Sequence, residues 1–345
     1  MAEQVESYTS TVPVSYVKTF LEGIQVDQAD LNCILERAGV SAKLLSMPDA
    51  RMTQEQFSTL FQLLVVHVDD EMPGLYGRPL RRGTLKVLTI LMLDAPNLQA
   101  ALRRWHQFDH VLHDDFSFTI DRGADLTAIG INLYPPQARS ARLVQELHLK
   151  LVHGISSWVI GKKIELERVD FAFARPPDAS EYIFIFPGPV YFDQPNTAMY
   201  IKSSYLDAPV QHRSKLELRD FLFNAPQNWF FVPFNENILS HQVRKYLESH
   251  LHENSDMESV AQALNYSTRT LGRRLQEERT TFHQIKDGLR RDVAVQKLIK
   301  TGEPVDAIAA AIGFTSVTAF YRSFRIWTGG TPRSYRRRNT EGKTQ

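Results

Sequence analysis

The feature that most restricts the fold of this chain is an internal repeat near its C-terminal end. The stretch VAQALNY, residues 260–266, matches IAAAIGF, residues 308–314, at an offset of 48 residues. In each copy an apolar, alanine-rich helix is predicted to end at a short turn with an aromatic residue. After the turn the match resumes at an offset of 49 residues, pairing Leu271, Arg273 and Leu275 with Phe320, Arg322 and Phe324. The repeat predicts two copies of a helix-turn-helix.

Each copy also carries the local signals of such a turn. Asn265 and Gly313 stand where the chain leaves the first helix, and both residue types tolerate the left-handed backbone that such an exit uses. Ser267 and Ser316 follow at predicted N-caps, where a hydroxyl accepts a hydrogen bond from the first free amides of the second helix.

Apolar and basic residues alternate along the second helix of each copy. Residues four apart share a helix face, so Leu271 and Leu275, like Phe320 and Phe324, are predicted to face a core. Arginines lie between these positions and are predicted to project outward. A helix of this kind fits the major groove of DNA, where arginine can donate two hydrogen bonds to one guanine.

The segment between the copies predicts one continuous helix. Apolar residues recur at Ile285, Leu289, Val293 and Leu298. Such a rod would hold the two recognition helices at a fixed separation, so that a single chain reads neighbouring sub-sites about one DNA turn apart.

The charge distribution points to the same partner. Residues 236–345 hold 18 Lys+Arg and 12 Asp+Glu, a balance of +6, whereas residues 1–235 hold 22 and 27, a balance of −5. A basic terminal region suggests an anionic polymer as its partner, and on charge alone a chance imbalance is the alternative.

Residues 257–338 resemble the DNA-binding domain of the AraC/XylS family of bacterial transcription regulators. The stretch IGFTSVTAFYRSFRIWTGGTPRSYRRR, residues 312–338, carries most of the resemblance. The chain departs from the family pattern at Gly272, where relatives usually have a long polar side chain. The resemblance implies a mainly structural role for the pattern from Gly329 to Arg336. Ser267 and Ser316 could contact phosphates or serve only as helix caps. Arg336 and Arg337 could contact phosphates or belong to a solvated basic tail. The implied base-reading residues are Thr268, Arg269, Gly272, Arg273, Val317, Thr318 and Arg322.

The preceding part of the chain reads as a mixture of helices and strands. A capping box at Thr53 and Gln56, an N-cap at Asn97 and a hairpin over 116–134 are its main local signals. Residues 10–210 resemble the arabinose-binding-type N-terminal domain of the same family, which implies effector sensing or dimerisation without establishing a sugar ligand. The predicted ranges are 1–225 for this domain, 226–237 for a linker, 238–338 for the DNA-binding domain and 339–345 for a tail.

Other kinds of site find little support. His106, His110 and His113 could share a helix face and bind a transition metal, but solvated histidines at a helix end give the same pattern. The single cysteine, Cys33, excludes a multi-cysteine zinc site and is expected to be buried on a helix. No nucleophile elbow, phosphate-binding glycine loop or HExxH motif is present, so neither an enzyme nor a cofactor is expected. Without a long apolar segment or a signal peptide, the expected location is the cytoplasm.

The sequence thus predicts an α+β N-terminal effector and dimerisation domain followed by an all-α DNA-binding domain with two helix-turn-helix motifs joined by a long helix. The expected function is that of a homodimeric transcription regulator, in the family's usual mode an activator. Its expected partners are double-stranded promoter DNA, RNA polymerase and a small-molecule effector whose binding residues are not identified. The alternatives are a constitutive regulator whose N-terminal domain only dimerises, a metal-responsive regulator and an architectural DNA-coating protein.

Overall fold

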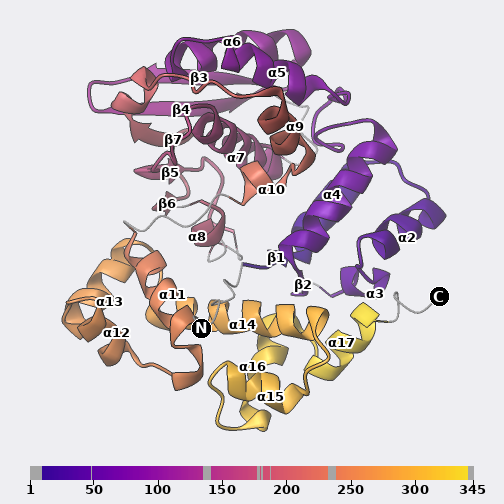
Figure 1. Ribbon diagram of the computed structural model, residues 1–345, viewed down its shortest axis with the longest axis vertical. Helices are drawn as coiled ribbons and strands as arrows, with labels where there is room; N and C mark the ends of the chain where they lie inside the picture. The colour runs from indigo at the N-terminus through magenta and orange to yellow at the C-terminus, as the bar shows by residue number, and fades with distance from the viewer. Residues whose placement is uncertain are drawn as a thin grey trace. The chain divides into compact units, whose positions relative to one another are not determined.

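The computed structural model describes residues 10–47, 49–134, 141–176, 179, 182–186, 188–231 and 238–340. Their contacts divide the chain into two compact units, a helical unit and a sheet unit (Figure 1). The helical unit contains the described residues of 10–18, 26–60 and 238–340, and the sheet unit contains those of 19–25 and 61–231. These units do not follow the order of the chain. The domain ranges drawn from the sequence remain a prediction.

The sheet unit is built on five strands in the order β3-β4-β7-β5-β6. β5 and β6 run parallel, and the other neighbours are antiparallel. The predicted hairpin is confirmed, with Phe116 opposite Leu133. β5 spans only three residues, but beyond its end the Phe171 amide still donates to the Tyr191 carbonyl at 2.8 Å, and the Phe171 and Phe173 rings stack with their centroids 4.8 Å apart. The strands are β3 (Phe116–Arg122), β4 (Leu126–Leu133), β5 (Arg168–Asp170), β6 (Val190–Tyr191) and β7 (Thr197–Lys202).

Two long helices cover one face of this sheet. Phe118 of β3 packs against Trp105 of α6 (Leu98–Leu112) and His148 of α7 (Ala141–Val159), with ring centroids 6.1 and 6.0 Å apart. The predicted N-cap is confirmed, since the Asn97 side chain accepts from the amide of Ala100 at 2.9 Å. The other helices of the unit are α5 (Thr84–Leu93), α8 (Tyr182–Ile185), η2 (Ser203–Asp207), α9 (Lys215–Phe223) and α10 (Gln227–Phe230).

Part of the expected linker belongs to this unit. α10 packs on α7 so closely that a Cβ atom at Gly154 would lie 2.5 Å from the Trp229 Cα, and only glycine permits that approach. The Trp229 side chain is buried. The rest of the expected linker, residues 232–237, lies outside the described residues.

The N-terminal part of the helical unit contains a two-stranded ribbon and short helices. β1 (Val12–Pro13) pairs with β2 (Arg51–Met52). The predicted capping box at the start of α4 is confirmed by reciprocal bonds between Thr53 and Gln56 at 3.0 and 3.2 Å. Cys33 is exposed on its helix, so the expectation of a buried cysteine was wrong. The helices here are α2 (Gln28–Arg37), α3 (Ala42–Leu45) and the first parts of α1 (Val14–Gly23) and α4 (Gln54–Val68).

The C-terminal part of the helical unit contains both helix-turn-helix motifs. Asn265 and Gly313 have φ angles of 61° and 76°, which confirms the predicted left-handed exits. The long connecting helix is also confirmed. The elements are α11 (Leu239–Ser249), η3 (Leu251–Glu253), α12 (Met257–Ala263), α13 (Thr268–Glu277), α14 (Phe282–Lys300), α15 (Val305–Ala311), α16 (Val317–Thr328) and α17 (Pro332–Thr340).

Candidate nucleic-acid interface

The two candidate recognition helices, α13 and α16, begin at serine caps as predicted. The Ser267 hydroxyl accepts from the amide of Thr270 at 3.2 Å, and the Ser316 hydroxyl accepts from the amide of Ala319 at 3.5 Å. Their inward faces are fully buried at Leu271, Leu275, Phe320 and Phe324. This anchoring leaves the opposite face of each helix free to contact a ligand.

The first recognition helix presents two arginines to solvent. Thr268, Arg269 and Arg273 are exposed. Arg273 Nη1 donates to Glu277 Oε1 at 2.9 Å, but both side chains are more than half exposed, at 66% and 59%. An ion pair in that setting contributes little, so the Arg273 guanidinium can exchange this carboxylate for another acceptor.

Gly272 lies differently from its predicted base-reading neighbours. It is half-buried, and a Cβ atom added there would lie 3.1 Å from the Met257 Cε of α12. This position therefore faces the preceding helix of its own motif. The nearest atom is the flexible end of the Met257 side chain, and the predicted contact at Gly272 has no side chain with which to read a base.

The second recognition helix exposes all three predicted residues, Val317, Thr318 and Arg322. It also exposes Ile326, whose side chain is 79% accessible and which follows Arg322 at i+4 on the same face. The sequence reasoning missed Ile326. The available signal was an isoleucine that breaks the apolar spacing set by Phe320 and Phe324.

One buried guanidinium connects the two motifs. Arg290 of α14 donates through Nη2 to Asn254 Oδ1 at 2.7 Å and to the Gly313 carbonyl at 2.9 Å. The same guanidinium lies over the Phe314 ring, 4.7 Å from its centroid. Asn254 precedes α12, and Gly313 forms the turn before α16. Arg290 thus fixes both motifs against the 19-residue α14, which is about 28 Å long at 1.5 Å per residue.

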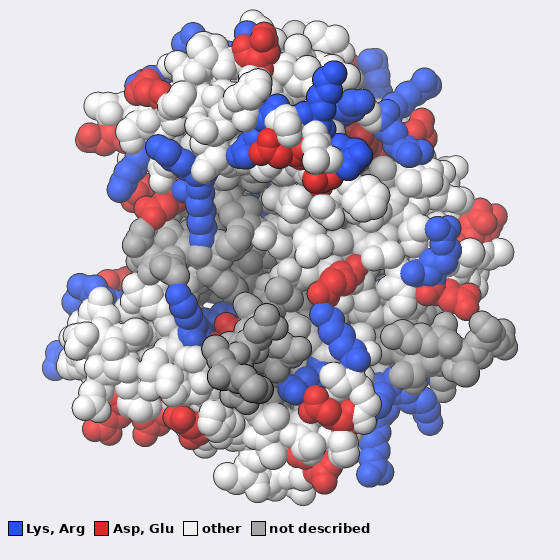
Figure 2. All heavy atoms as spheres, in the orientation of Figure 1, with Lys and Arg blue, Asp and Glu red and all other residues white. Residues whose placement is uncertain are grey.

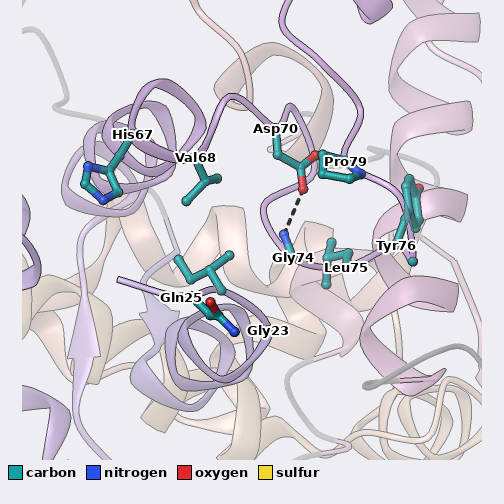
Figure 3. A pocket seen from close by; sticks show the side chains of 11 residues that line it. Gly23, Gln25, His67, Val68, Asp70, Gly74, Leu75, Tyr76 and Pro79 are labelled. Carbon is teal, nitrogen blue, oxygen red and sulfur yellow. Dashed lines mark hydrogen bonds between the residues drawn. The ribbon is translucent and has the colours of Figure 1, made fainter. Parts of the chain in front are cut away.

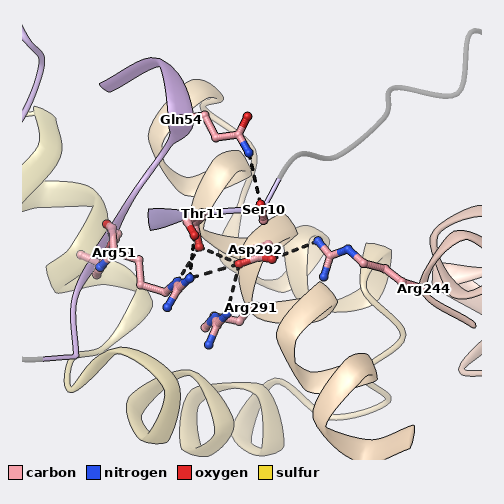
Figure 4. A network of polar contacts seen from close by, with 8 residues as sticks. Ser10, Thr11, Arg51, Gln54, Arg244, Arg291 and Asp292 are labelled. Atoms are coloured by element: carbon pink, nitrogen blue, oxygen red, sulfur yellow. Dashed lines mark hydrogen bonds and ion pairs between the residues drawn. The ribbon is translucent and has the colours of Figure 1, made fainter. Parts of the chain in front are cut away.

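A second buried network joins α14 to the N-terminal ribbon (Figure 4). The Asp292 carboxylate is fully buried and lies 3.0 Å from Arg244 Nη2, 3.5 Å from Arg291 Nη2 and 3.9 Å from Arg51 Nε. Thr11 donates its hydroxyl proton to Asp292 Oδ1 at 2.6 Å. Sequence reasoning missed this network, because no local pattern links Thr11 and Arg51 to a residue of α14.

The C-terminal helix α17 is held by the same ribbon. The Tyr335 hydroxyl donates to the Arg51 carbonyl and accepts from the Arg51 amide at 3.1 Å. Burial raises the pKa of Tyr335, so the phenol stays protonated. These bonds agree with the structural role implied for the end of the domain.

The candidate phosphate contacts are Ser267, Ser316, Arg336 and Arg337. Ser267 and Ser316 already cap their helices, and Arg336 Nη2 donates to the Glu303 carbonyl at 2.6 Å. Arg337 is exposed. Figure 2 shows Lys and Arg side chains gathered at the lower right, where Figure 1 places α17. Phosphate contact by these four residues remains a prediction.

The structure does not bring the three candidate metal-binding histidines together. His106 and His110 are exposed on α6, whereas His113 follows the end of that helix and is buried. The His106 ring nitrogen Nδ1 lies 2.6 Å from the Phe118 carbonyl. Within the described part of the chain, no group of three His, Cys, Asp or Glu side chains is arranged to hold a metal ion.

The sheet unit contains a pocket of about 530 Å³ (Figure 3). Gly23 and Gln25 form one side of it, and the end of α4 and the loop from Asp70 to Pro79 form the others. The Asp70 carboxylate organises this loop by accepting from the amides of Met72, Gly74 and Leu80, each at 3.0 Å.

Behind one wall of this pocket lies a buried polar cluster. The Tyr76 hydroxyl lies 3.4 Å from His148 Nδ1, and His148 Nε2 lies 3.7 Å from Asp109 Oδ2. Burial raises the pKa of Asp109 to about 7 and lowers that of His148 to about 3. Near neutral pH the imidazole is therefore uncharged, and its closest carboxyl is partly protonated.

Comparisons with known proteins agree with this geometry. Residues 29–210 match the family model described as the arabinose-binding domain of AraC transcription regulator, N-terminal, and residues 260–338 match a helix-turn-helix domain. The chain belongs to the AraC family of transcription regulators. It is a DNA-binding regulator, and the named relatives with an assigned role are regulators, not enzymes. Among the described residues, no helix has the length and apolar character needed to cross a membrane.

Known transcription regulators are similar to this protein over different shares of the chain. The ornithine utilization regulator of Pseudomonas aeruginosa is 26% identical over 340 residues, which are 97% of this chain and 99% of that protein. The regulator VqsM of the same species is 31% identical over 128 residues, 37% of this chain and 38% of that protein. The crystal structure of the regulator CdpR from P. aeruginosa is 20% identical, covers 91% of this chain and 99% of its own, and has a TM-score of 0.31.

Proposed function

We propose that this AraC-family regulator is a promoter-specific activator whose DNA binding is controlled by a small-molecule effector in the sheet unit. α13 and α16 enter successive major grooves on one face of the DNA. Arg269, Arg273 and Arg322 read bases, with Thr268, Val317 and Thr318 beside them. The chain acts as a homodimer and contacts RNA polymerase when the effector is bound.

The observation that carries the proposal is the exposure of arginines on both recognition helices while their opposite faces are locked in the core. Among the described residues, Arg322 has no ion-pair or hydrogen-bond partner, and Arg273 has only the exposed Glu277. A guanidinium placed in this way can donate two parallel bonds to guanine O6 and N7. Each such pair contributes about 1–3 kcal/mol of discrimination between bases.

A metabolite effector is supported by one comparison. The relative aligned over nearly the whole chain is named for ornithine utilization. The sheet unit also offers a pocket of about 530 Å³ and buried polar groups, none of which belongs to the recognition helices. Small-molecule sites are concave and have a few convergent polar groups, as this unit does.

The test is recovery of genomic DNA bound by the protein, followed by a footprint on the strongest fragment. We expect two protected contacts per subunit, about one helical turn apart. Arg322→Ala and Arg273→Ala should each weaken specific binding roughly 5- to 150-fold while leaving non-specific binding nearly unchanged. Arg333→Ala, an exposed arginine of α17, is the matched control. Equal affinity for all sequences, with unaltered binding by both variants, would instead identify a DNA-coating protein.

A further inference from the structure

The α7 face that includes Glu146, Lys150 and His153 is polar, although the helix is buried there. These positions follow one another at i, i+4 and i+7, so they form one stripe along the helix. Their relative exposures are 2%, 1% and 0%. Buried polar groups of this kind almost always have hydrogen-bond partners, so the partner of each one needs to be identified.

Glu146 has its partners. Its Oε1 atom accepts from Arg142 Nε at 2.7 Å and also from the Tyr182 hydroxyl. A glutamate at i pairs readily with a lysine at i+4, and Glu146 would be the natural counter-ion of Lys150. Here its carboxylate is bound on the other side by Arg142 and Tyr182 instead.

Among the residues that the structure describes, the Lys150 ammonium has no such counter-ion. Its Nζ atom is fully buried and has no hydrogen-bond partner among them, and one described neighbour is the Phe186 ring, 5.8 Å from Nζ to the centroid. Burial lowers the pKa of Lys150, and the positive charge of Lys163 lowers it further. Lysine is almost never fully buried without a paired anion, because an isolated charge in the interior is strongly unfavourable.

His153 has a hydrogen-bond acceptor, whereas Lys150 has donors. Its Nε2 atom lies 2.8 Å from the Ile164 carbonyl, which can only accept, so Nε2 carries the proton. Burial together with the charge of Lys150 lowers the pKa of His153 to about 3, so the ring is neutral. Its Nδ1 atom is then an acceptor, and it is buried without a hydrogen-bond partner in the described part of the chain. One turn of α7 thus holds an unmatched donor and an unmatched acceptor.

We propose that this stripe of α7 is a ligand site for a small carboxylic acid that also carries a hydrogen-bond donor next to its carboxylate. The carboxylate binds Lys150 Nζ, and the adjacent hydroxyl or ammonium group donates to His153 Nδ1. Apolar atoms of the ligand pack on Phe186. This inference rests on the effector control proposed above and assigns the chemical class of that effector.

The test measures the melting temperature of the full-length protein with five-carbon probes that differ in one group. Pentanoate, 2-hydroxypentanoate and 2-aminopentanoate carry the acid, while 2-pentanol and 2-aminopentane lack it. We expect the acids to raise Tm by about 2 °C or more at saturation, and those with a donor to saturate at lower concentration. The two probes without an acid should leave Tm unchanged.

Two substitutions assign the effect to residues. Lys150→Met should raise Tm without ligand, because it replaces an unpaired buried charge by an apolar side chain of similar length, and it should abolish the response to all three acids. His153→Gln should keep the response to pentanoate and lose the preference for the hydroxy and amino acids. Lys86→Met, at an exposed lysine of α5, should behave as wild type.

The outcomes separate the two proposals. If no acid stabilises wild type more than Lys150→Met, the ligand site is wrong, whatever the DNA measurements show. If the acids stabilise wild type through Lys150 but leave promoter binding and transcription unchanged, the site stands and effector control through it is wrong. A lower Tm for ligand-free Lys150→Met would show that Lys150 is structural, and would also overturn the site.

Discussion

The Thr11 hydroxyl donates a hydrogen bond to the Asp292 carboxylate at 2.6 Å, although the two residues are 281 positions apart in the chain. This bond joins the N-terminal segment to α14, the helix that connects the two helix-turn-helix motifs. Three guanidinium groups lie within 4 Å of the same carboxylate, so its negative charge is a counter-ion that they share.

Asp292→Asn should destabilise the helical unit strongly. The amide removes the negative charge and leaves three guanidinium groups without their shared counter-ion, a loss of about 3–5 kcal/mol in the free energy of unfolding. Chemical denaturation of the wild type and the variant measures this difference in the free energy of unfolding. Asp287→Asn, at an exposed position of the same helix, is the control and should change the free energy by less than about 0.5 kcal/mol. Equal effects of the two substitutions would contradict the importance of the buried network.

Arg290→Lys should uncouple the two motifs. Lysine keeps the charge but cannot reproduce the planar fork that reaches both Asn254 and Gly313. We expect affinity for a DNA fragment with both sub-sites to fall by more than affinity for a fragment with one of them. Gel-shift titrations on matched fragments make the comparison, with Arg325→Lys on the surface of α16 as the control. A proportional loss on both fragments would speak against a bridging role.

Gly272→Ala should stabilise the protein, whereas Gly313→Ala should destabilise it. Glycine inside a helix is about 0.5–1 kcal/mol less favourable than alanine, and the added methyl group meets only the flexible end of Met257 at 3.1 Å. At Gly313 the φ angle of 76° disfavours alanine, and the new Cβ would lie 2.7 Å from the Leu251 carbonyl oxygen. Thermal unfolding of both variants should give shifts of opposite sign. Shifts of the same sign would show that one of these backbone environments is wrong.

The buried Lys150 should make stability depend on pH above neutrality. Burial, with a smaller contribution from the charge of Lys163, lowers the Lys150 pKa from 10.5 to about 7 in the folded protein. Between these values the unfolded chain binds the extra proton, so the contribution of this group to stability rises with pH from about 7 to 10.5. Denaturation curves give the free energy of unfolding of wild type and of Lys150→Met at each pH, and the difference between the two isolates the contribution of Lys150. A difference that stays constant over this window would mean that Lys150 is not desolvated.

Local features were the ones that the sequence predicted well. Caps, left-handed exits and the hairpin depend on residues within a few positions of one another, and Ser267, Asn265 and Gly313 behave as expected. The buried faces of α13 and α16 could be predicted equally well, because helical periodicity alone places Leu271 and Phe320 in the core.

Features set by distant parts of the chain could not be predicted. Nothing near Asp292 indicates that it meets Thr11, and nothing near Cys33 indicates that its side of α2 remains exposed. His113 is buried rather than aligned with His106, because α6 ends at Leu112 and the chain turns into an extended conformation. Such placements depend on tertiary contacts, which override local pattern.

The pairing of the ribbon with C-terminal residues also affects the order in which the two units can fold during synthesis. Thr11 and Arg51 leave the ribosome early, but their partners Asp292 and Tyr335 are made only after the whole sheet unit. Since domains generally begin to fold from the N-terminal side during translation, the sheet unit can fold while the early segment still has no partner. The helical unit closes last. A nascent chain that stops before α17 therefore lacks the tyrosine that holds β2, and it should be a better substrate for chaperones than the finished protein.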